Sequence, residues 1–242
     1  MPEFEYLPDV GAMIERAAAL TAEAMSEAVQ ARGTFLFALS GGNTPRPVYQ
    51  RLAEEPYSRN LPWHDAGIYF GDDRVVPPDD ANSNYRMARE ALLDHVDVSA
   101  HNVHRICGET GPLDAARLYD QDLRRLAGQT ATNIPRFDLV HLGLGPDGHT
   151  ASLFPETDVL TNMTDLAAAV HLPASSEGAS KAVDRVTMTY PVLNAARHII
   201  FLVAGDDKAD ALRRVREGDE SAPATCVRPT NGTVRWLIVG KE

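Results

Sequence analysis

The sequence predicts an α/β protein whose mostly parallel, doubly wound sheet is covered by helices on both faces. Three observations predict this Rossmann-like fold. Short apolar runs recur along the chain, segments of helical periodicity separate most of them, and glycine-rich segments follow several of the runs. Strands joined by helices imply right-handed crossovers and hence a mostly parallel sheet. The 242 residues contain no repeat and no long polar linker, so we expect a single domain over 1–242.

The first elements show the clearest patterns. Apolar side chains recur at helical spacing from Val10 to Ala28, and Gly33 follows as a stop, so residues 10–31 are predicted to be helical. The run TFLFAL at 34–39 has the length and composition of a buried strand. Thr44-Pro45 is expected to open the next helix, because a proline in the first turn lacks only an N–H that would be unpaired there anyway.

The same alternation continues to the C-terminus. Further strands are expected at 66–70, 103–106, 137–142, 167–172, 186–189, 198–203 and 234–239. Further helices are expected at 84–95, 112–126 and 208–216, and one beginning near Asp147. Residues 173–184 and 218–231 are predicted to be surface loops. In a sheet of this kind, ligands bind beyond the carboxyl ends of the strands, so the segments that follow the strands are the place to look for chemistry.

Composition excludes several classes of partner. The formal net charge of −11 is spread along the chain, which disfavours binding to nucleic acid or to an anionic membrane. The two cysteines, Cys107 and Cys226, are far apart and match no metal-ligand spacing. The first ten residues do not resemble a signal peptide, and no apolar stretch is long enough to cross a bilayer. We expect a cytoplasmic protein, either a monomer or a weak homodimer.

Two polar segments follow the first two predicted strands. The first segment is a candidate phosphate cradle, with glycines for close approach and hydroxyls that can donate, although an ordinary strand-to-helix turn fits equally well. It consists of Ser40, Gly41, Gly42, Asn43 and Thr44. In the second segment, Asp72 and Arg74 could orient a sugar hydroxyl or a carbonyl. By themselves, however, they fit an exposed surface ion pair better.

The segment GLGPDGHTASLFP follows the predicted strand 137–142. Its three glycines match the dinucleotide-binding pattern GxGxxG, and Asp165 lies about twenty residues further on. Asp165 nevertheless precedes the next predicted strand instead of ending it, and the pattern lies past the middle of the chain. Dinucleotide binding is therefore disfavoured.

His149 is the most informative residue of this segment. The positive end of the helix expected near Asp147 would favour a neutral imidazole that can accept a proton, and Asp147 could orient the ring. A catalytic base and a structural histidine remain equally good interpretations from these residues alone. Arg185, before the predicted strand 186–189, and Lys208, at a predicted helix start, are candidate cations for an anion, although Lys208 alone could equally be a solvated lysine.

Taken together, these motifs resemble the family of glucosamine-6-phosphate isomerases and 6-phosphogluconolactonases over nearly the whole chain. The resemblance rests on FALSGGNTP, FGDDRVVPPDDANSNY, FDLVHLGLGPDGHTASLFP and RVTMTYPVLNAARHIIFLVAGDDK. Deaminases of this family resemble DGHxAFNEP, whose Glu assists ring opening. Here Ala151–Pro155 contains no Glu, and Glu156 is displaced beyond the proline, which favours the lactonases. The lactonase pattern commonly reads Asp-Glu-Arg, so the role of Asp73 stays open.

The resemblance implies hydrolysis of 6-phospho-D-glucono-1,5-lactone in the oxidative pentose phosphate pathway, without cofactor or metal. In that interpretation His149, oriented by Asp147, activates water, and Asp72 and Arg74 belong to the reacting end. The phosphate would be bound by Ser40, Gly41, Gly42, Asn43, Thr44, Arg185 and Lys208. Two alternatives are a glucosamine-6-phosphate deaminase or isomerase, and a non-enzymatic sugar-phosphate-sensing domain. The sensor would need a DNA-binding module, and the single acidic helix at 10–31 does not provide one.

Overall fold

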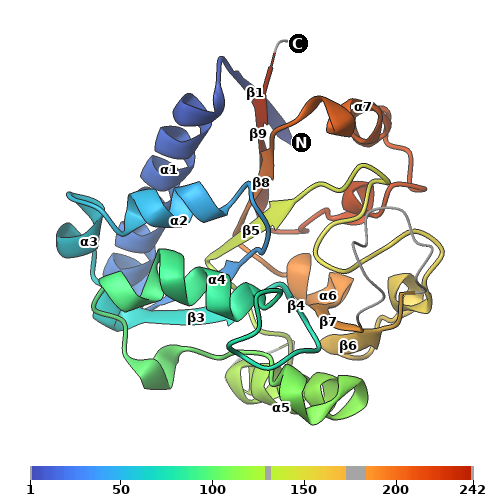
Figure 1. Ribbon diagram of the computed structural model, residues 1–242, viewed down its shortest axis with the longest axis horizontal. Coiled ribbons are helices and arrows are strands. Elements are labelled where there is room, and N and C mark those ends of the chain that lie inside the picture. Colours follow the sequence, from blue (N-terminus) through green and yellow to red (C-terminus); the bar gives the residue numbers. More distant parts are fainter. Residues whose placement is uncertain (1, 129–131, 173–183, 241–242) are drawn as a thin grey trace.

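A parallel six-stranded sheet forms the centre of the protein (Figure 1). The computed structural model describes residues 2–128, 132–172 and 184–240. The sheet has the order β1-β9-β8-β5-β2-β3 and every neighbouring pair is parallel. Its strands are β1 (Glu3–Leu7), β2 (Phe35–Leu39), β3 (Ala66–Phe70), β5 (Leu139–Gly143), β8 (His198–Val203) and β9 (Thr233–Val239).

Helices lie on both sides of this sheet. They are α1 (Val10–Arg32), α2 (Arg46–Leu52), α3 (Tyr57–Asn60), α4 (Asn84–Ala91), α5 (Pro112–Ala127), α6 (Tyr190–Leu193) and α7 (Ala209–Glu217). Short 3-10 turns are η1 (Trp63–Asp65), η2 (Leu93–His95), η3 (Ala100–Asn102), η4 (Gly108–Thr110), η5 (Asp158–Thr161), η6 (Asp206–Lys208) and η7 (Pro223–Cys226). In Figure 1, α1 and α2 lie on one side of the sheet, and α6 lies on the other. The predicted α/β fold with a mostly parallel sheet is confirmed.

A second, antiparallel sheet lies on the same side as α6. Its order is β4 (Asp72–Arg74), β7 (Arg185–Met188) and β6 (Ala167–Val170). Asp72 is paired with Thr187, and Arg74 is paired with Arg185. The small sheet therefore brings two segments that are far apart in the sequence into one register beside the carboxyl ends of the large sheet.

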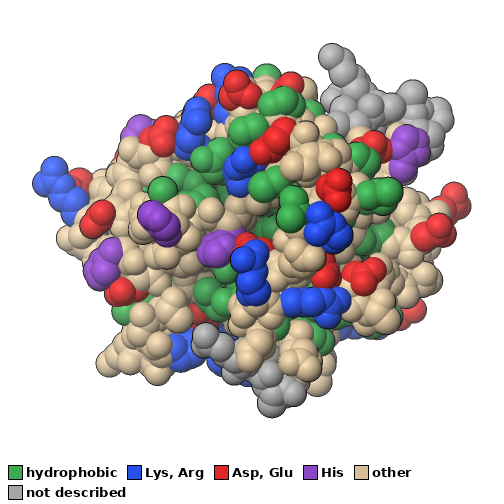
Figure 2. All heavy atoms as spheres, turned by 90° about the horizontal axis from the view of Figure 1, so that it is seen from below, with side chains coloured by type: hydrophobic (Ala, Val, Ile, Leu, Met, Phe, Trp, Pro, Cys, Tyr) green, Lys and Arg blue, Asp and Glu red, His purple; other side chains and the backbone are tan. Residues whose placement is uncertain are grey.

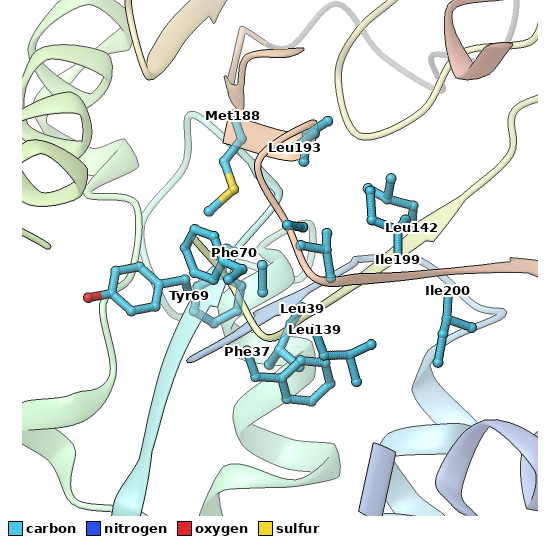
Figure 3. Packing of buried hydrophobic residues seen from close by; sticks show 14 of the residues in the cluster. Phe37, Leu39, Tyr69, Phe70, Leu139, Leu142, Met188, Leu193, Ile199 and Ile200 are labelled. Atoms are coloured by element: carbon cyan, nitrogen blue, oxygen red, sulfur yellow. The ribbon is translucent and has the colours of Figure 1, made fainter. Parts of the chain in front are cut away.

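Buried side chains of both sheets form one hydrophobic cluster. Figure 3 shows Phe37, Leu139 and Ile199 of the large sheet close together, with Met188 of β7 and Leu193 of α6 lying above them. This shared core holds the small sheet on the large one. The prediction of a single domain stays a prediction, although the continuous core is what such a domain requires.

Most predicted elements lie within two or three residues of the observed ones, and the strands at 66–70 and 198–203 have the predicted bounds. Two predictions are wrong. Residues 103–106 form no strand, and Val103 makes only an isolated bridge with Ile68. No helix begins near Asp147, because Gly148 has a φ of 90° and Ala151 a φ of 48°, values that an α-helix cannot contain.

Two strands were not predicted, and one loop prediction needs correction. β1 and β4 were missed because β1 mixes acidic and apolar side chains and β4 is only three residues long. Residues 218–231 are not simply a surface loop, because Ala222 and Ala224 are buried and the Ala224 N–H donates to the Gly148 carbonyl at 3.0 Å. The predicted loop at 173–184 lies, except for Asp184, outside the described residues.

The surface carries both signs of charge. In Figure 2, positively and negatively charged side chains are interspersed on the face shown, with hydrophobic side chains between them. Among the described helices, none is long and apolar enough to cross a membrane. The cytoplasmic location and the oligomeric state stay predictions.

Candidate active site

A cavity of about 380 Å³ lies where the carboxyl ends of β2, β5 and β8 meet the small sheet. Every residue predicted to bind phosphate lines it, as do His149, Asp72 and Arg74. Asp147, the remaining predicted residue, is not part of the lining and lies behind His149. The structure thus brings together segments that are more than 150 residues apart in the chain.

The loop Ser40–Thr44 forms one wall of the cavity. A Cβ on Gly41 would lie 1.9 Å from Oδ1 of Asn84, so only glycine leaves room for that side chain. Gly42 has a φ of 98°, a conformation that glycine adopts without strain. Within the described chain, the backbone N–H groups of Gly41, Gly42, Asn43 and Thr44 donate to no acceptor. This wall therefore offers free donors to an anion.

α2 contributes less to this wall than the sequence suggested. It begins at Arg46, not at Thr44, and contains only seven residues. The anion-binding capacity of this wall therefore resides in the loop itself.

Asp72 is a buried carboxylate at the cavity wall. It is 5% exposed, and its Oδ2 accepts a hydrogen bond from the Ser152 hydroxyl at 2.6 Å. The Asn84 amide donates to the Asp72 backbone carbonyl at 2.9 Å. Asp72 is therefore fixed in place and can accept from a ligand hydroxyl, but as an anion it cannot itself stabilise a developing oxyanion.

Asp73, whose role the sequence left open, has a structural role. Its carboxylate accepts from the backbone N–H groups of Asn84 at 2.6 Å and Tyr85 at 3.0 Å, in the first turn of α4. Burial raises the pKa of Asp73 to about 6, although these backbone hydrogen bonds act in the opposite direction. Asp73 thus anchors α4 to β4, and it does not line the cavity.

Arg74 and Arg185 face each other across the β4–β7 pair. The Nε atom of each is buried without a partner in the described structure, and one Nη of Arg74 donates to the Asn82 carbonyl at 2.6 Å. Burial lowers the pKa of Arg185, which is only 9% exposed, while the nearby Asp72 carboxylate opposes that shift. Like charges in direct cross-strand register are unfavourable, so an anion bound beside either guanidinium would reduce the repulsion between them.

Lys208 also lines the cavity. It ends the 3-10 turn η6 and precedes α7, which begins at Ala209. Its Nζ forms an ion pair with Asp207 at 2.7 Å, and this contact lowers the pKa of Asp207. A ligand anion would have to share or replace Asp207 as the partner of Lys208.

His149 is held by Asp147. Nδ1 of His149 lies 2.5 Å from Oδ1 of Asp147, and the backbone N–H of His149 donates to the same oxygen at 3.0 Å. Burial acts to raise the pKa of Asp147, but the hydrogen bonds and the electrostatic interaction with His149 outweigh it, so the pKa lies below its ordinary value. Asp147 is therefore ionised at neutral pH and accepts the proton on Nδ1, which leaves Nε2 for the cavity. The predicted effect of a helix dipole on His149 does not apply, because that helix is absent.

Two neighbours restrict the orientation of the His149 ring. The ring stacks on Phe154 with centroids 4.1 Å apart, and the Arg185 guanidinium lies 5.4 Å from the centroid of the same Phe154 ring. A Cβ on Gly145 would lie 2.0 Å from Nδ1 of His149. Gly145 is therefore needed for the imidazole to reach Asp147, which explains one glycine of the GxGxxG pattern without a dinucleotide.

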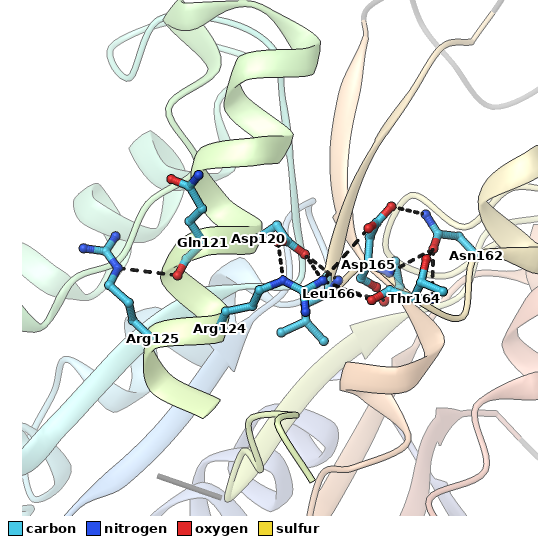
Figure 4. Close-up of polar contacts among 9 residues, drawn as sticks. Asp120, Gln121, Arg124, Arg125, Asn162, Thr164, Asp165 and Leu166 are labelled. Carbon is cyan, nitrogen blue, oxygen red and sulfur yellow. Dashed lines mark hydrogen bonds and ion pairs between the residues drawn. The ribbon is translucent and has the colours of Figure 1, made fainter. Parts of the chain in front are cut away.

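Asp165 does not take part in a nucleotide site. Figure 4 shows it in the segment before β6, where it accepts from the Asn162 amide at 2.9 Å and faces Arg124 of α5 at 4.0 Å. Asp120 of α5 in turn accepts from the Leu166 N–H at 2.7 Å. These contacts join α5 to the small sheet, and Asp165 does not line the cavity.

Reasoning from the sequence missed the residues that support the site. Asn84, Ser152, Phe154 and Thr187 hold Asp72, His149 or their loops in place. Ser152 and Phe154 lie in the motif after His149, so their proximity was a usable signal, whereas Thr187 reaches the site only through strand register. Across the described residues, no cluster of three or more His, Cys, Asp or Glu side chains could hold a metal ion.

The fold and the cavity define an α/β protein with a candidate anion-binding site, and comparison with known proteins identifies the family. The sequence profile described as glucosamine-6-phosphate isomerases/6-phosphogluconolactonase matches residues 8–236. The chain therefore belongs to this family. The predicted family is confirmed.

Two sequence relatives and one solved structure similar to this chain are 6-phosphogluconolactonases. A 6-phosphogluconolactonase of Nostoc sp. is 38% identical over 97% of this chain and 94% of its own. A 6-phosphogluconolactonase of Synechocystis sp. is 39% identical over 98% of this chain and 95% of its own. The crystal structure of 6-phosphogluconolactonase from Thermotoga maritima superposes with a TM-score of 0.83 and 28% identity, covering 98% of this chain and all of the other. The predicted enzyme class, a lactonase-type hydrolase, is confirmed by these matches.

Proposed function

We propose that this protein hydrolyses 6-phospho-D-glucono-1,5-lactone to 6-phosphogluconate, as a cytoplasmic step of the oxidative pentose phosphate pathway. One observation carries the proposal. His149, oriented through Nδ1 by an ionised Asp147, presents Nε2 to the same cavity that the loop Ser40–Thr44 and Arg185 line with donors. His149 could act on the ester bond of a lactone while the loop Ser40–Thr44 binds the phosphate of the same molecule.

In the proposed reaction His149 acts as the general base. Nε2 takes a proton from water as the water oxygen attacks the C1 carbonyl of the lactone. Asp147 stabilises the imidazolium that forms, because its carboxylate already accepts the hydrogen bond from Nδ1. The proton then passes from Nε2 to the ring oxygen as the C1–O bond breaks, which gives the open-chain acid.

The other cavity residues divide between the phosphate and the carbonyl. The free N–H groups of Gly41, Gly42, Asn43 and Thr44, with Arg185 and Lys208, bind the phosphate. Arg74 is the group we assign to the developing oxyanion, because its buried Nε has no partner in the described structure and its charge has the right sign. Asp72 accepts from a sugar hydroxyl and keeps its position through Ser152.

The cavity supports a lactonase over a deaminase. Among the described residues, its lining contains two carboxylates, Asp72 and Asp207, and no glutamate. Glu156, the first glutamate after His149 in the sequence, is exposed and does not line the cavity. The deaminases of the resemblance have a Glu that assists ring opening, and the described part of the lining offers no such group.

The proposal is tested by the rate of hydrolysis of freshly generated 6-phosphogluconolactone, measured against a protein-free blank because the lactone also opens spontaneously. We expect wild-type acceleration, and a loss of roughly 10²–10⁴ in kcat with little change in KM for His149→Ala. His64→Ala is the matched control, because the His64 ring pairs with its neighbour Asp65 and does not line the cavity. Glucono-1,5-lactone, which has no phosphate, should be a much poorer substrate.

Each arm of this experiment has a result that contradicts the proposal. A wild-type rate equal to the blank would remove the lactonase activity, and release of ammonia from glucosamine 6-phosphate would replace it with the deaminase. A His149→Ala enzyme that keeps most of its kcat would show that another group activates water.

A further inference from the structure

Two buried tyrosines make the same unusual pair of contacts with the backbone. The Tyr49 hydroxyl accepts from the Ser40 N–H at 2.8 Å and donates to the Ser40 carbonyl at 3.1 Å. The Tyr119 hydroxyl accepts from the Phe70 N–H at 2.9 Å and donates to the Phe70 carbonyl at 2.8 Å. Tyr49 lies in α2 and Tyr119 lies in α5, so the two contacts come from different helices.

Sheet geometry explains why a hydroxyl is needed at these two points. In a parallel strand, the N–H and C=O of one residue point to the same neighbouring strand. β2 pairs with β5 only at Phe37 and Ala38, so Ser40 lies beyond that ladder. β3 is the outer strand of the sheet, so the outward groups of Phe70 have no strand to pair with. Each hydroxyl therefore replaces a missing strand for one residue.

Both residues stand directly before a segment of the candidate active site. Ser40 begins the loop Ser40–Thr44, and Phe70 is followed by Gly71 and then Asp72. Leu39 and Phe70 are register partners, so the two fixed points lie on adjacent strands. Burial raises the pKa of both tyrosines far above the ordinary value, so each hydroxyl keeps its proton and can accept and donate at once.

We propose that Tyr49 and Tyr119 are positioning residues that divide the site between them. Tyr49 sets the position of the phosphate-binding loop Ser40–Thr44, and Tyr119 sets the position of Asp72 and Arg74. This inference rests on the proposed function, because it assigns each tyrosine to one part of the same reaction. It predicts that removing the two hydroxyls produces different kinetic defects, although the two chemical changes are identical.

The test compares Tyr49→Phe with Tyr119→Phe, each of which keeps the buried ring. For Tyr49→Phe we expect KM for the phosphorylated lactone to rise about tenfold with kcat changed less than about threefold. Turnover of glucono-1,5-lactone should be unchanged, because that substrate has no phosphate. For Tyr119→Phe we expect kcat to fall about tenfold on both lactones, with KM changed less than about threefold.

A second readout does not depend on turnover. The affinity for the product 6-phosphogluconate, measured by titration calorimetry, should weaken about tenfold in Tyr49→Phe and stay within about twofold of wild type in Tyr119→Phe. Trp63→Phe is the structural control. Its indole Nε1 donates to the Tyr57 carbonyl at 3.1 Å, and the residue is buried but does not line the cavity. It should lower the melting temperature and leave both kcat and KM unchanged.

The outcomes separate the two proposals. If wild type does not hydrolyse the lactone, the proposed function fails. If wild type is active and the two tyrosine variants show the same kinetic change as each other, or behave like Trp63→Phe, the positioning inference is wrong while the function stands. Folding of each variant is verified by circular dichroism at the assay temperature. If Tyr49→Phe fails to fold, Tyr119→Phe alone still tests the inference, because a rise in its KM without a fall in its kcat would overturn it.

Discussion

His141 should make the stability of this protein depend on pH, and the size of the effect follows from its surroundings. It lies on β5 with no exposed surface, stacked on Tyr49 with centroids 5.9 Å apart and edge-on to Phe37 at 4.8 Å. The Thr21 hydroxyl donates to the Ala17 carbonyl at 2.8 Å, so Thr21 can only accept from Nε2 of His141. Nδ1 is buried without a partner in the described structure.

Protonation would place an N–H on Nδ1 inside the core, with no acceptor. Burial accordingly lowers the pKa of His141 from 6.5 to about 3. A histidine with a lowered pKa in the folded state contributes stability that is present above the unfolded pKa and is lost as pH falls from 6.5 towards 3. At about 1.4 kcal/mol per pKa unit, the whole loss is about 5 kcal/mol, and about 2 kcal/mol of it falls between pH 7.5 and pH 5.

The assay is urea unfolding of wild type and His141→Gln at pH 7.5 and pH 5. The glutamine amide can still donate to Thr21 but does not titrate, so the variant should be less stable at pH 7.5 and lose about 2 kcal/mol less than wild type on acidification. Asp73 acts in the opposite direction, because its raised pKa of about 6 contributes stability as pH falls through that value. Asp73 is common to both proteins, so the difference between them isolates His141.

An exposed histidine provides the control. His101→Gln should keep the full pH dependence of wild type, since His101 is at the surface. Equal losses of stability in wild type and His141→Gln between pH 7.5 and pH 5 would refute the argument that the buried imidazole must charge when the protein is acidified.

Two further predictions concern the candidate active site. Gly145→Ala should lower kcat by roughly 10²–10³, because its Cβ would overlap the His149 ring and push Nδ1 away from Asp147. Gly128→Ala, whose Cβ would meet nothing closer than 3.5 Å, should leave kcat unchanged, and equal rates of the two variants would contradict the steric argument. Arg185→Ala should raise KM for the phosphorylated lactone by about 10- to 100-fold with little change in kcat, as steady-state kinetics would show, since a charge-assisted hydrogen bond is worth about 1.5–3 kcal/mol. An unchanged KM would mean that Arg185 does not touch the phosphate.

The fold could be predicted wherever one strong local pattern decided an element. The helix from Val10 and the strand from His198 were visible because apolar residues recur at one period over the whole segment. β4 could not be predicted in this way. Asp72–Arg74 is a strand only because β7 pairs with it, and that pairing is a tertiary contact between segments about 110 residues apart.

The sequence predicted which residues would line the candidate site better than it predicted the bounds of the strands and helices, and the reason is physical. In a parallel sheet the segments after the strands converge at one edge, so a list of polar residues that follow strands is also a list of neighbours. The exceptions are residues whose role depends on exact contacts. Tyr49 looked like an ordinary apolar position of a helix, and nothing in the sequence indicated that its hydroxyl reaches Ser40.

The cavity contains a like-charged pair and polar groups without partners in the described structure, both of which are unfavourable unless a ligand binds there. Arg74 opposite Arg185 is an unfavourable pair in a sheet, and the buried Nε of each has no partner in the described structure. The loop that follows Ser40 presents backbone donors that have no acceptor among the described residues. In the proposed function a phosphorylated lactone would give these groups their acceptors, the phosphate for Arg185 and the loop and the C1 oxygen for Arg74. It follows that a phosphorylated ligand should stabilise the fold as well as occupy the site, since binding to the folded state alone raises the free energy of unfolding.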